Sequence, residues 1–372
     1  MAGRKQIVFC TDGIFPHAVG GMQRHSSLLI EELARSGKFK IIAIHPHKEN
    51  VFSPSMGIEE IALDFPRNEK SYLLNAYKYS AKVLEQLKKY PDAIIYSQGM
   101  SVWKGISSVK DRLIINLHGL EPYQTIESFK YFKAWRFRLI FNYLLRTSNT
   151  VISLGGRLTG ILKKITGDAS KIAVIPNAVI VGDLPERNFK KETLQLLFVG
   201  RFSYNKGIHV LMKAIEELNR EGYKNRLIFN LVGKGPQFEH YVKSFSFPNV
   251  NFLGFASDED LQKLYIENDL FVFPTLYEGM PTVVLEAMAK GMPIIVSDTG
   301  ATAEQVDHKN GFLVEKNNVR ALKWAIQSFY QMDAEKRHAL SDASYTRVKE
   351  KFTWPMVARQ HEELFNTFIT HQ

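Results

Sequence analysis

Two carboxylates occur in a mostly apolar stretch of the sequence, YEGMPTVVLEAMAKGMP at residues 277–293. Glu286 has apolar neighbours on both sides, so it needs a buried partner or costs several kcal/mol of desolvation, at order of magnitude. A ribose diol is a suitable partner. Glu278 precedes this apolar run and could hydrogen-bond the polar groups of a ligand. The structural alternative is that both carboxylates only cap or solubilise a helix.

Cations and glycines occur at two further places. GRFSYNKG carries Arg201 and Lys206 on a loop that leads into a helix, where two cations near free N–H groups suit a diphosphate. Gly20 and Gly21 also precede a helix and would let a phosphate approach the backbone. The alternatives are solvated loop charges in the first case and a flexible turn in the second. GxGxxG and the Walker A pattern are both absent.

One histidine, His118, follows the apolar run LIINL and is succeeded by Gly119. A histidine at the end of a strand is more often packed or hydrogen-bonded than catalytic, so its position alone carries little weight.

The elements that must position these residues are short apolar runs alternating with longer amphipathic segments. The runs are QIVFC, KIIAI, AIIYS, LIINL, TVISL, LQLLFV, RLIFNLV, DLFVFP and PIIVS. Such continuous runs indicate parallel strands covered on both faces, and therefore an α/β fold. Ligands of open α/β sheets bind beyond the carboxyl ends of the strands, where the residues named above occur.

A helix is predicted after DLFVFPT, because Pro281 stands near its first turn and Gly291 lies just past its end. Glu278 then lies in the turn before this helix and Glu286 inside it. The N–H groups of Thr282 and Val283 would be left free at the helix start.

Length predicts two domains, because 372 residues exceed what one core usually organises. The polar stretch 180–192 is the candidate linker. No apolar run is long enough for a transmembrane helix. The N-terminal apolar run is too short for a signal peptide and is predicted to be the first strand. The lone Cys10 cannot form an internal disulfide. The expected compartment is the cytoplasm.

Charge is unevenly distributed, since residues 1–185 hold 25 of the 48 basic residues but only 15 of the 38 acidic ones. Such an excess suits an anionic membrane surface, a phosphorylated acceptor or nucleic acid. Nucleic acid is disfavoured, because the cations are dispersed and none of the usual binding motifs occurs. The basic and aromatic segment at residues 128–149 suggests peripheral attachment to the membrane. The alternative is a partly buried helix, because its cations spread around the helical wheel.

Four motifs resemble those of glycosyltransferase family 4, the group 1 retaining enzymes of the GT-B fold: GGMQRH, HGLEP, GRFSYNKG and EGMPTVVLEAMAKGMP. The resemblance spans nearly the whole chain. It implies two Rossmann-like, doubly wound domains that face each other across a cleft: an acceptor domain at 1–180 and a nucleotide-sugar domain at 190–350. It also implies a closing helix, at 351–372, that crosses back to the first domain.

The same resemblance implies a role for each site residue. His118 would be the acceptor-side histidine, Glu278 would hold a donor-sugar hydroxyl, and Glu286 would hold the ribose. Arg201 and Lys206 would bind the diphosphate. Gly21, together with Gly20, would contact the phosphates from the first domain. The remaining donor-binding residues would be Gly279, Met280, Pro281, Thr282 and Val283. No cofactor or metal is expected.

The expected function is therefore transfer of a hexosyl unit from a nucleotide sugar to a glycan, lipid-linked or small-molecule acceptor. The resemblance to the family implies a place in cell-surface polysaccharide biosynthesis. Two rivals are open: a nucleotide-sugar epimerase or phosphorylase of similar shape, and a non-catalytic sugar-nucleotide binder. Epimerisation would consume donor without an acceptor, and a binder would show no turnover. The base, the sugar and the acceptor are undetermined by the sequence.

Overall fold

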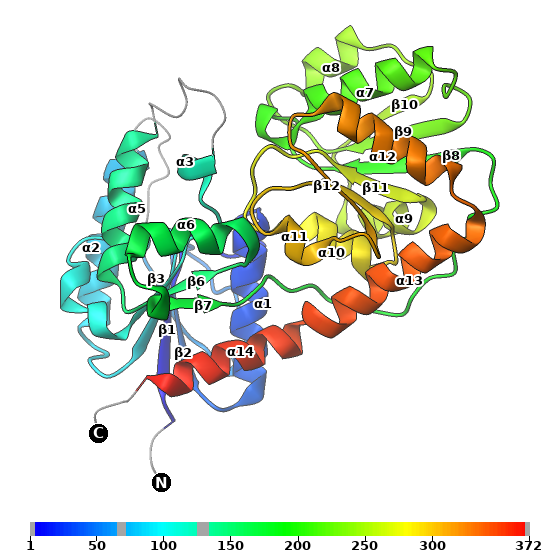
Figure 1. The fold of residues 1–372 in the computed structure, drawn as a ribbon. Coiled ribbons are helices and arrows are strands. Elements are labelled where there is room, and N and C mark those ends of the chain that lie inside the picture. Colours follow the sequence, from blue (N-terminus) through cyan, green and yellow to red (C-terminus); the bar gives the residue numbers. More distant parts are fainter. Residues whose placement is uncertain (1–3, 65–71, 125–133, 369–372) are drawn as a thin grey trace. The chain divides into compact units, whose positions relative to one another are not determined.

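The computed structural model describes residues 4–64, 72–124 and 134–368 (Figure 1). The chain divides into two compact units. Unit 1 consists of Met1–Tyr123, Glu127–Asn177 and Trp354–Gln372, and unit 2 consists of Gln124–Ile126 and Ala178–Thr353.

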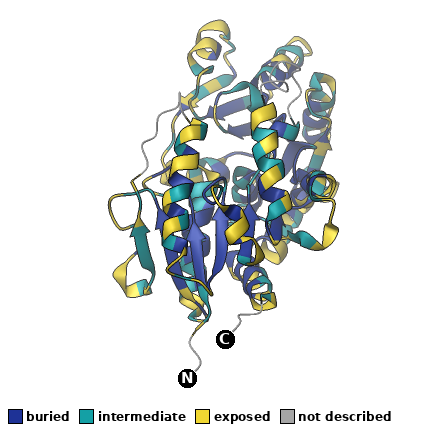
Figure 2. Cartoon of the chain, turned by 90° about the vertical axis from the view of Figure 1, so that its left-hand side faces the viewer, coloured by how far each residue is buried: buried dark blue, intermediate teal, exposed yellow. Residues whose placement is uncertain are grey.

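Unit 1 is built on a seven-stranded parallel sheet with the order β3-β2-β1-β4-β5-β6-β7. Its strands are β1 (Gln6–Cys10), β2 (Lys40–His45), β3 (Glu59–Ala62), β4 (Ile94–Gln98), β5 (Leu113–Asn116), β6 (Thr150–Ser153) and β7 (Ile172–Val174). Its helices are α1 (Gly21–Ser36), α2 (Tyr72–Leu87), α3 (Glu121–Gln124), α5 (Trp135–Thr147), α6 (Gly156–Thr166) and α14 (Trp354–Thr367). Figure 2 shows the strands buried and the surrounding helices exposed along their outer faces.

Unit 2 is built on a six-stranded parallel sheet with the order β10-β9-β8-β11-β12-β13. Its strands are β8 (Leu194–Val199), β9 (Leu227–Val232), β10 (Val250–Gly254), β11 (Leu270–Phe273), β12 (Ile294–Ser297) and β13 (Gly311–Val314). Its helices are α7 (Ile208–Arg220), α8 (Phe238–Ser244), α9 (Asp258–Glu267), α10 (Thr282–Ala289), α11 (Thr302–Gln305), α12 (Val319–Gln331) and α13 (Ala334–Lys351). The prediction of two parallel α/β domains is confirmed.

Each sheet reverses its strand order once, between β1 and β4 in unit 1 and between β8 and β11 in unit 2. At the first reversal, Val8 of β1 lies between Ile42 and Ile95 in parallel register, and all three are buried. At the second, Leu197 of β8 lies opposite Phe271 of β11. Loops that leave the two strands at such a point diverge, which makes it the usual place for a ligand.

Four strands were not among the apolar runs of the sequence: β3, β7, β10 and β13. All four are short and partly exposed, and residues 250–253 of β10 alternate between half-buried and exposed. Each of β3, β7, β10 and β13 lies at an edge of its sheet. A strand with one neighbour needs fewer apolar residues, so its sequence signal is weaker.

The last helix, α14, belongs to unit 1 although it follows the helices of unit 2 in the chain. It packs beside α1, and the two are drawn in red and blue in Figure 1. Phe365 of α14 is buried, with its ring centroid 6.4 Å from that of Phe9 in β1. The core of unit 1 therefore contains side chains from both ends of the chain.

Candidate functional site

The loops after β8 and β11 of unit 2 meet through an ion pair between Lys206 and Glu278. The ammonium of Lys206 contacts the carboxylate Oε1 of Glu278, and the two side chains are only 21% and 14% exposed. The ammonium also lies 5.5 Å from the ring centroid of Phe273, at the end of β11. A cation and a carboxylate are thus placed together where the strand order reverses.

The two loops are joined by their main chains as well. The carbonyl of Asn205 accepts the N–H of Leu276 at 2.8 Å and the hydroxyl of Thr275 at 3.0 Å. Gly207 has φ +70°, and a Cβ atom there would lie 1.8 Å from the carbonyl oxygen of Pro274. Only glycine fits such a close approach in the left-handed region. The pair of Lys206 and Glu278 is therefore held by a rigid loop contact.

The helix that follows Glu278 begins without a side-chain cap. Pro281 is the N-cap residue of α10, and its carbonyl accepts the side-chain amide of Gln305 at 2.9 Å. Thr282 and Val283, the first two helical residues, are half-buried. Helix starts of this kind present N–H groups and a partial positive charge to an anion.

The other residues before α10 differ in accessibility. Gly279 is half-buried and its carbonyl accepts the N–H of Ala301 at 2.8 Å, while Met280 is buried. Gly300 has φ +52°, and a Cβ there would lie 2.3 Å from the carbonyl oxygens of Glu278 and Gly279. The loop after β12 therefore closes against the main chain that carries Glu278.

Glu286 lies inside α10 and is half-buried. The hydroxyl of Tyr265 donates to its Oε2 at 2.9 Å, and Tyr265 is fully buried. The need for a partner, expected from its apolar neighbours, is thus met in part by a tyrosine of α9. Sequence reasoning missed Tyr265, because nothing in the local pattern links the two residues.

Arg201 directly follows β8 and Gly200, and its side chain is exposed. The sequence grouped it with Lys206 as a diphosphate ligand. In the structure it is Lys206 that contacts Glu278, and Arg201 stands in the same loop without taking part in that pair.

In unit 1, Gly20 is the N-cap residue of α1 and Gly21 its first residue. This helix also begins without a side-chain cap. It follows β1, at the reversal point of this sheet, and its second turn carries the buried His25.

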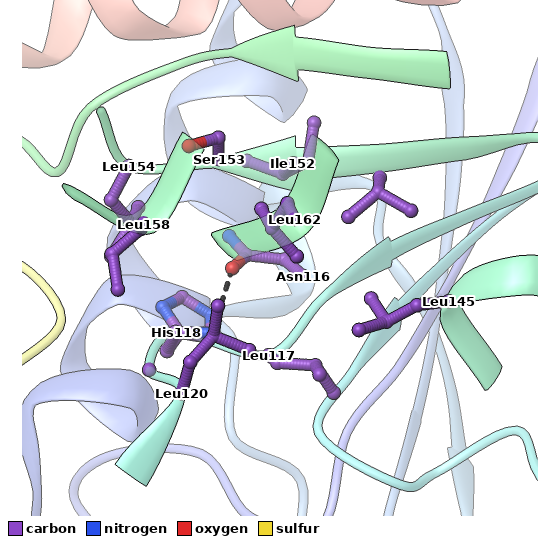
Figure 3. A pocket seen from close by; sticks show the side chains of 12 residues that line it. Asn116, Leu117, His118, Leu120, Leu145, Ile152, Ser153, Leu154, Leu158 and Leu162 are labelled. Carbon is purple, nitrogen blue, oxygen red and sulfur yellow. Dashed lines mark hydrogen bonds between the residues drawn. The ribbon is translucent and has the colours of Figure 1, made fainter. Parts of the chain in front are cut away.

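His118 lies just after β5 in the left-handed conformation, with φ +56°. Such backbone costs a non-glycine residue of order 1 to 3 kcal/mol and occurs mainly where the surroundings enforce it. The residue is half-buried, but its Nε2 atom is shielded from solvent and has no hydrogen-bond partner among the described residues. A pocket of about 10 Å³ lies here, and half of its lining residues are leucines. Figure 3 shows His118 and Asn116 beside each other at this pocket.

The imidazole of His118 belongs to a buried cluster with His25 and His361. The ring centroid of His25 is 4.8 Å from that of His118 and 6.4 Å from that of His361. Burial, followed by the influence of His361, lowers the pKa of His118 to about 3. Burial lowers the pKa of His361 to about 4 and that of His25 well below its usual value. Sequence reasoning missed His25 and His361, which lie far from His118 in the chain.

Two features are absent from the described part of the chain. No group of three or more His, Cys, Asp or Glu residues there could hold a metal ion. Among the helices drawn in full in Figure 1, none is both long and apolar enough to cross a membrane.

Two family models match adjacent parts of the chain. The model described as glycosyltransferase family 4 matches residues 19–182, and the model described as glycosyl transferases group 1 matches residues 183–347.

A curated relative is the putative colanic acid biosynthesis glycosyltransferase WcaL of Escherichia coli K12. It is 24% identical over 233 residues, which cover 59% of this chain and 57% of WcaL. The chain spans about half the length of the curated relatives that it matches first, 43% and 57% of theirs.

Solved structures share the fold over nearly the whole chain. Sucrose-phosphate synthase from Thermosynechococcus elongatus superposes with a TM-score of 0.82 at 21% identity, covering 98% of this chain and 99% of the other. HepE from Anabaena, solved in complex with UDP and glucose, gives a TM-score of 0.71 at 19% identity, covering 98% and 100%. At this identity the likeness shows the fold.

Proposed function

The chain belongs to the glycosyl transferases of group 1, and we propose that it moves a sugar from a nucleotide sugar to a glycan, lipid-linked or small-molecule acceptor. The observation that carries this proposal is the contact of Lys206 with Glu278 at the reversal point of unit 2. The ammonium of Lys206 suits an anionic leaving group, and the carboxylate of Glu278 beside it suits the hydroxyls of a sugar. HepE, which has the same fold, was solved with UDP and glucose.

In the proposed reaction the bond between the anomeric carbon and the donor phosphate breaks as the acceptor oxygen bonds to the same face of that carbon. Because the new bond forms on the face that the phosphate leaves, the anomeric configuration is retained, and the acceptor proton passes to the departing phosphate. Negative charge grows on the nucleoside diphosphate, where Lys206, Arg201 and the start of α10 would stabilise it. No metal ion is needed in this scheme.

Recognition of the donor is divided between the two glutamates. Glu286 would accept hydrogen bonds from the ribose hydroxyls while Tyr265 holds its other side. Glu278 would leave its pairing with Lys206, or share it, to accept a hydroxyl of the transferred sugar. Gly279 and Met280 shape the turn between the two glutamates. Gly20 and Gly21 would let a phosphate approach the main chain at the start of α1.

The product we propose is a cell-surface polysaccharide or lipid-linked glycan, in keeping with the name of the colanic acid relative. We further propose a cytoplasmic protein that attaches peripherally to the inner face of the membrane through α5. Among the 13 residues of this helix only Leu144 and Leu145 are buried. Trp135, Leu139 and Tyr143, four residues apart, are 47%, 59% and 46% exposed.

The positive charge of α5 favours binding to an anionic lipid surface. The sequence of α5 includes Arg136, Arg138 and Arg146 and no carboxylate. The neighbouring helix α2 adds the exposed Tyr72, whose ring centroid lies 6.3 Å from that of Phe137. Aromatic side chains with interspersed arginines suit the headgroup region. The cations Lys130 and Lys133 of the predicted segment lie outside the described residues.

The test of the function is a screen of nucleotide sugars by thermal shift, with UDP-glucose as the first probe. A donor at 100 times its Kd should stabilise the protein by about 2.7 kcal/mol. Each donor that shifts the melting temperature is then incubated with and without glycan acceptors. Release of nucleoside diphosphate that depends on an acceptor supports transfer. Conversion of the donor to an isomeric sugar nucleotide without acceptor indicates an epimerase, and binding without turnover indicates a binder.

A further inference from the structure

Three hydrogen bonds connect the main chain of His118 to the last helix of the chain, and a fourth lies inside that helix. The N–H of His118 donates to Asn116 Oδ1 at 2.9 Å, and Asn116 Nδ2 donates to the hydroxyl oxygen of Tyr96 at 3.0 Å. The hydroxyl oxygen of Tyr96 lies 3.1 Å from His361 Nε2, and His361 Nδ1 lies 2.8 Å from the carbonyl oxygen of Val357. This hydrogen-bond chain runs from the loop after β5, through β4, to α14.

The direction of every bond in this chain is determined by its two ends. A main-chain carbonyl only accepts, so Nδ1 of His361 carries the proton and Nε2 of the neutral ring accepts from Tyr96. At the other end a main-chain N–H only donates, so Asn116 presents its oxygen to His118 and its amide to Tyr96. No member can be reoriented without breaking a bond.

The side chains of this hydrogen-bond chain are also buried away from water. Asn116 is 1% exposed, and Tyr96 and His361 are fully buried. A buried polar group that loses its partner keeps its desolvation cost, so each bond enforces the next. The lowered pKa of His361, about 4, keeps its ring neutral and able to accept from Tyr96 near neutral pH.

We propose that Asn116, Tyr96 and His361 are positioning residues that hold His118 in its left-handed conformation and so aim its imidazole at the acceptor. Asn116 Oδ1 accepts the N–H of His118, two residues ahead, in an Asx-turn that fixes the main chain of His118. Tyr96 and His361 fix the rotamer of Asn116. The inference rests on the proposed acceptor-side role of His118. It makes His361, which α14 supplies, a positioning residue of the acceptor unit.

The first test compares Tyr96→Phe with Phe365→Leu in the full chain. Tyr96→Phe keeps the ring and removes the hydroxyl that links Asn116 to His361. Phe365 is a matched control, because its buried ring lies 6.2 Å from that of Tyr96 and outside the hydrogen-bond chain. With a donor found in the screen, we expect Tyr96→Phe to lower kcat about tenfold with donor Kd unchanged. Phe365→Leu should lower the melting temperature and leave kcat unchanged below it.

A second pair of variants guards against misfolding of the first. His361→Gln places an amide oxygen near the position of Nε2 and can still accept from Tyr96, whereas His361→Leu cannot. The glutamine variant should retain most of kcat and the leucine variant should lose it. Amide hydrogen exchange around His118 should be faster in Tyr96→Phe and His361→Leu than in Phe365→Leu and His361→Gln.

The outcomes separate this inference from the function on which it rests. If His118→Ala keeps wild-type turnover, the proposed role of His118 is wrong. If His118→Ala is impaired while Tyr96→Phe and His361→Leu turn over like wild type, only the positioning inference is overturned. Equal losses of kcat in Phe365→Leu and Tyr96→Phe would overturn it too, because packing alone would then explain both.

Discussion

Lys206 and Glu278 neutralise each other at the ends of two neighbouring strands, although 72 positions of sequence separate them. Both side chains are largely shielded from water, so removing either leaves the other as a poorly solvated charge. A bound diphosphate and sugar would offer each of them a new partner. We therefore expect the pair to keep this part of the proposed site charge-balanced when no donor is bound.

Replacement of Lys206 should impair transfer directly. Lys206→Ala removes a charge-assisted contact that tightens as the phosphate departs, and we expect kcat/KM to fall roughly 10- to 1,000-fold. Lys213→Ala is the matched control, because Lys213 is exposed on α7, the next helix along the chain. Steady-state kinetics with purified variants provides the measurement. Full activity of Lys206→Ala would contradict the role in leaving-group stabilisation.

The two glutamates should differ in which ligand each recognises. Glu286→Ala should weaken nucleoside diphosphate and nucleotide sugar alike, by about 1.5 to 3 kcal/mol, because both ligands carry the ribose. Tyr265→Phe should weaken both in the same sense but less, since it frees the carboxylate that Tyr265 holds. Calorimetric titration with each ligand measures these changes.

Glu278→Ala should instead bind the free nucleotide nearly normally and lose affinity only when the sugar is present. Where the contact strengthens during transfer, kcat should fall as well. Equal losses for nucleotide and nucleotide sugar in this variant would refute the division of roles. A change in melting temperature without any ligand dependence would mean that the carboxylates serve only the helix.

Transfer should survive chelation. The proposed scheme neutralises the leaving group with Lys206, Arg201 and a helix start, so EDTA should leave the initial rate unchanged and added Mg²⁺ should not raise it. Product is best measured by chromatography of the released nucleoside diphosphate, which needs no metal-dependent coupling enzyme. A rate abolished by EDTA and restored by a divalent cation would require a metal in the mechanism.

Acid should destabilise unit 1 through its buried histidines. The pKa values of His361 and His118 are about 4 and about 3, below the ordinary 6.5. Between about pH 4 and 6.5 the unfolded chain therefore binds protons that the folded protein does not. The free energy of unfolding should fall as pH drops through this window, by up to about 1.4 kcal/mol per pH unit for each histidine.

Urea unfolding at pH 5, 6 and 7 measures this dependence. His361→Gln should show a shallower pH dependence than the wild type, and His240→Gln, at an exposed position of α8, should match the wild type. A pH dependence in His361→Gln as steep as that of the wild type would remove His361 as its source.

Membrane attachment should depend on α5. The wild type should cosediment with anionic vesicles at low salt more than with neutral ones, and Leu139→Glu should reduce this binding. Trp324→Glu, at a 61% exposed position of unit 2, controls for the loss of any exposed apolar side chain. Equal cosedimentation with both kinds of vesicle would exclude an electrostatic attachment.

The α/β class, the central strands and the loops that carry the candidate site were predictable from local sequence patterns. Continuous apolar runs such as LQLLFV and DLFVFP report burial on both faces, and Pro281 and Gly291 mark the limits of α10 within one or two residues. These are local signals, since the side chains that produce them lie within one element. The edge strands escaped detection because partial exposure weakens that signal.

Which side chains meet is fixed by the fold of the whole chain. Glu286 is paired with Tyr265, and His118 is linked through Tyr96 to His361, which lies 265 positions beyond Tyr96. Such partners depend on the order of strands in the sheet and on the return of α14 to unit 1. A local pattern of apolar and polar residues specifies which face of an element is buried. It does not specify the neighbour on that face, because many arrangements bury the same residues and only the folded chain selects one.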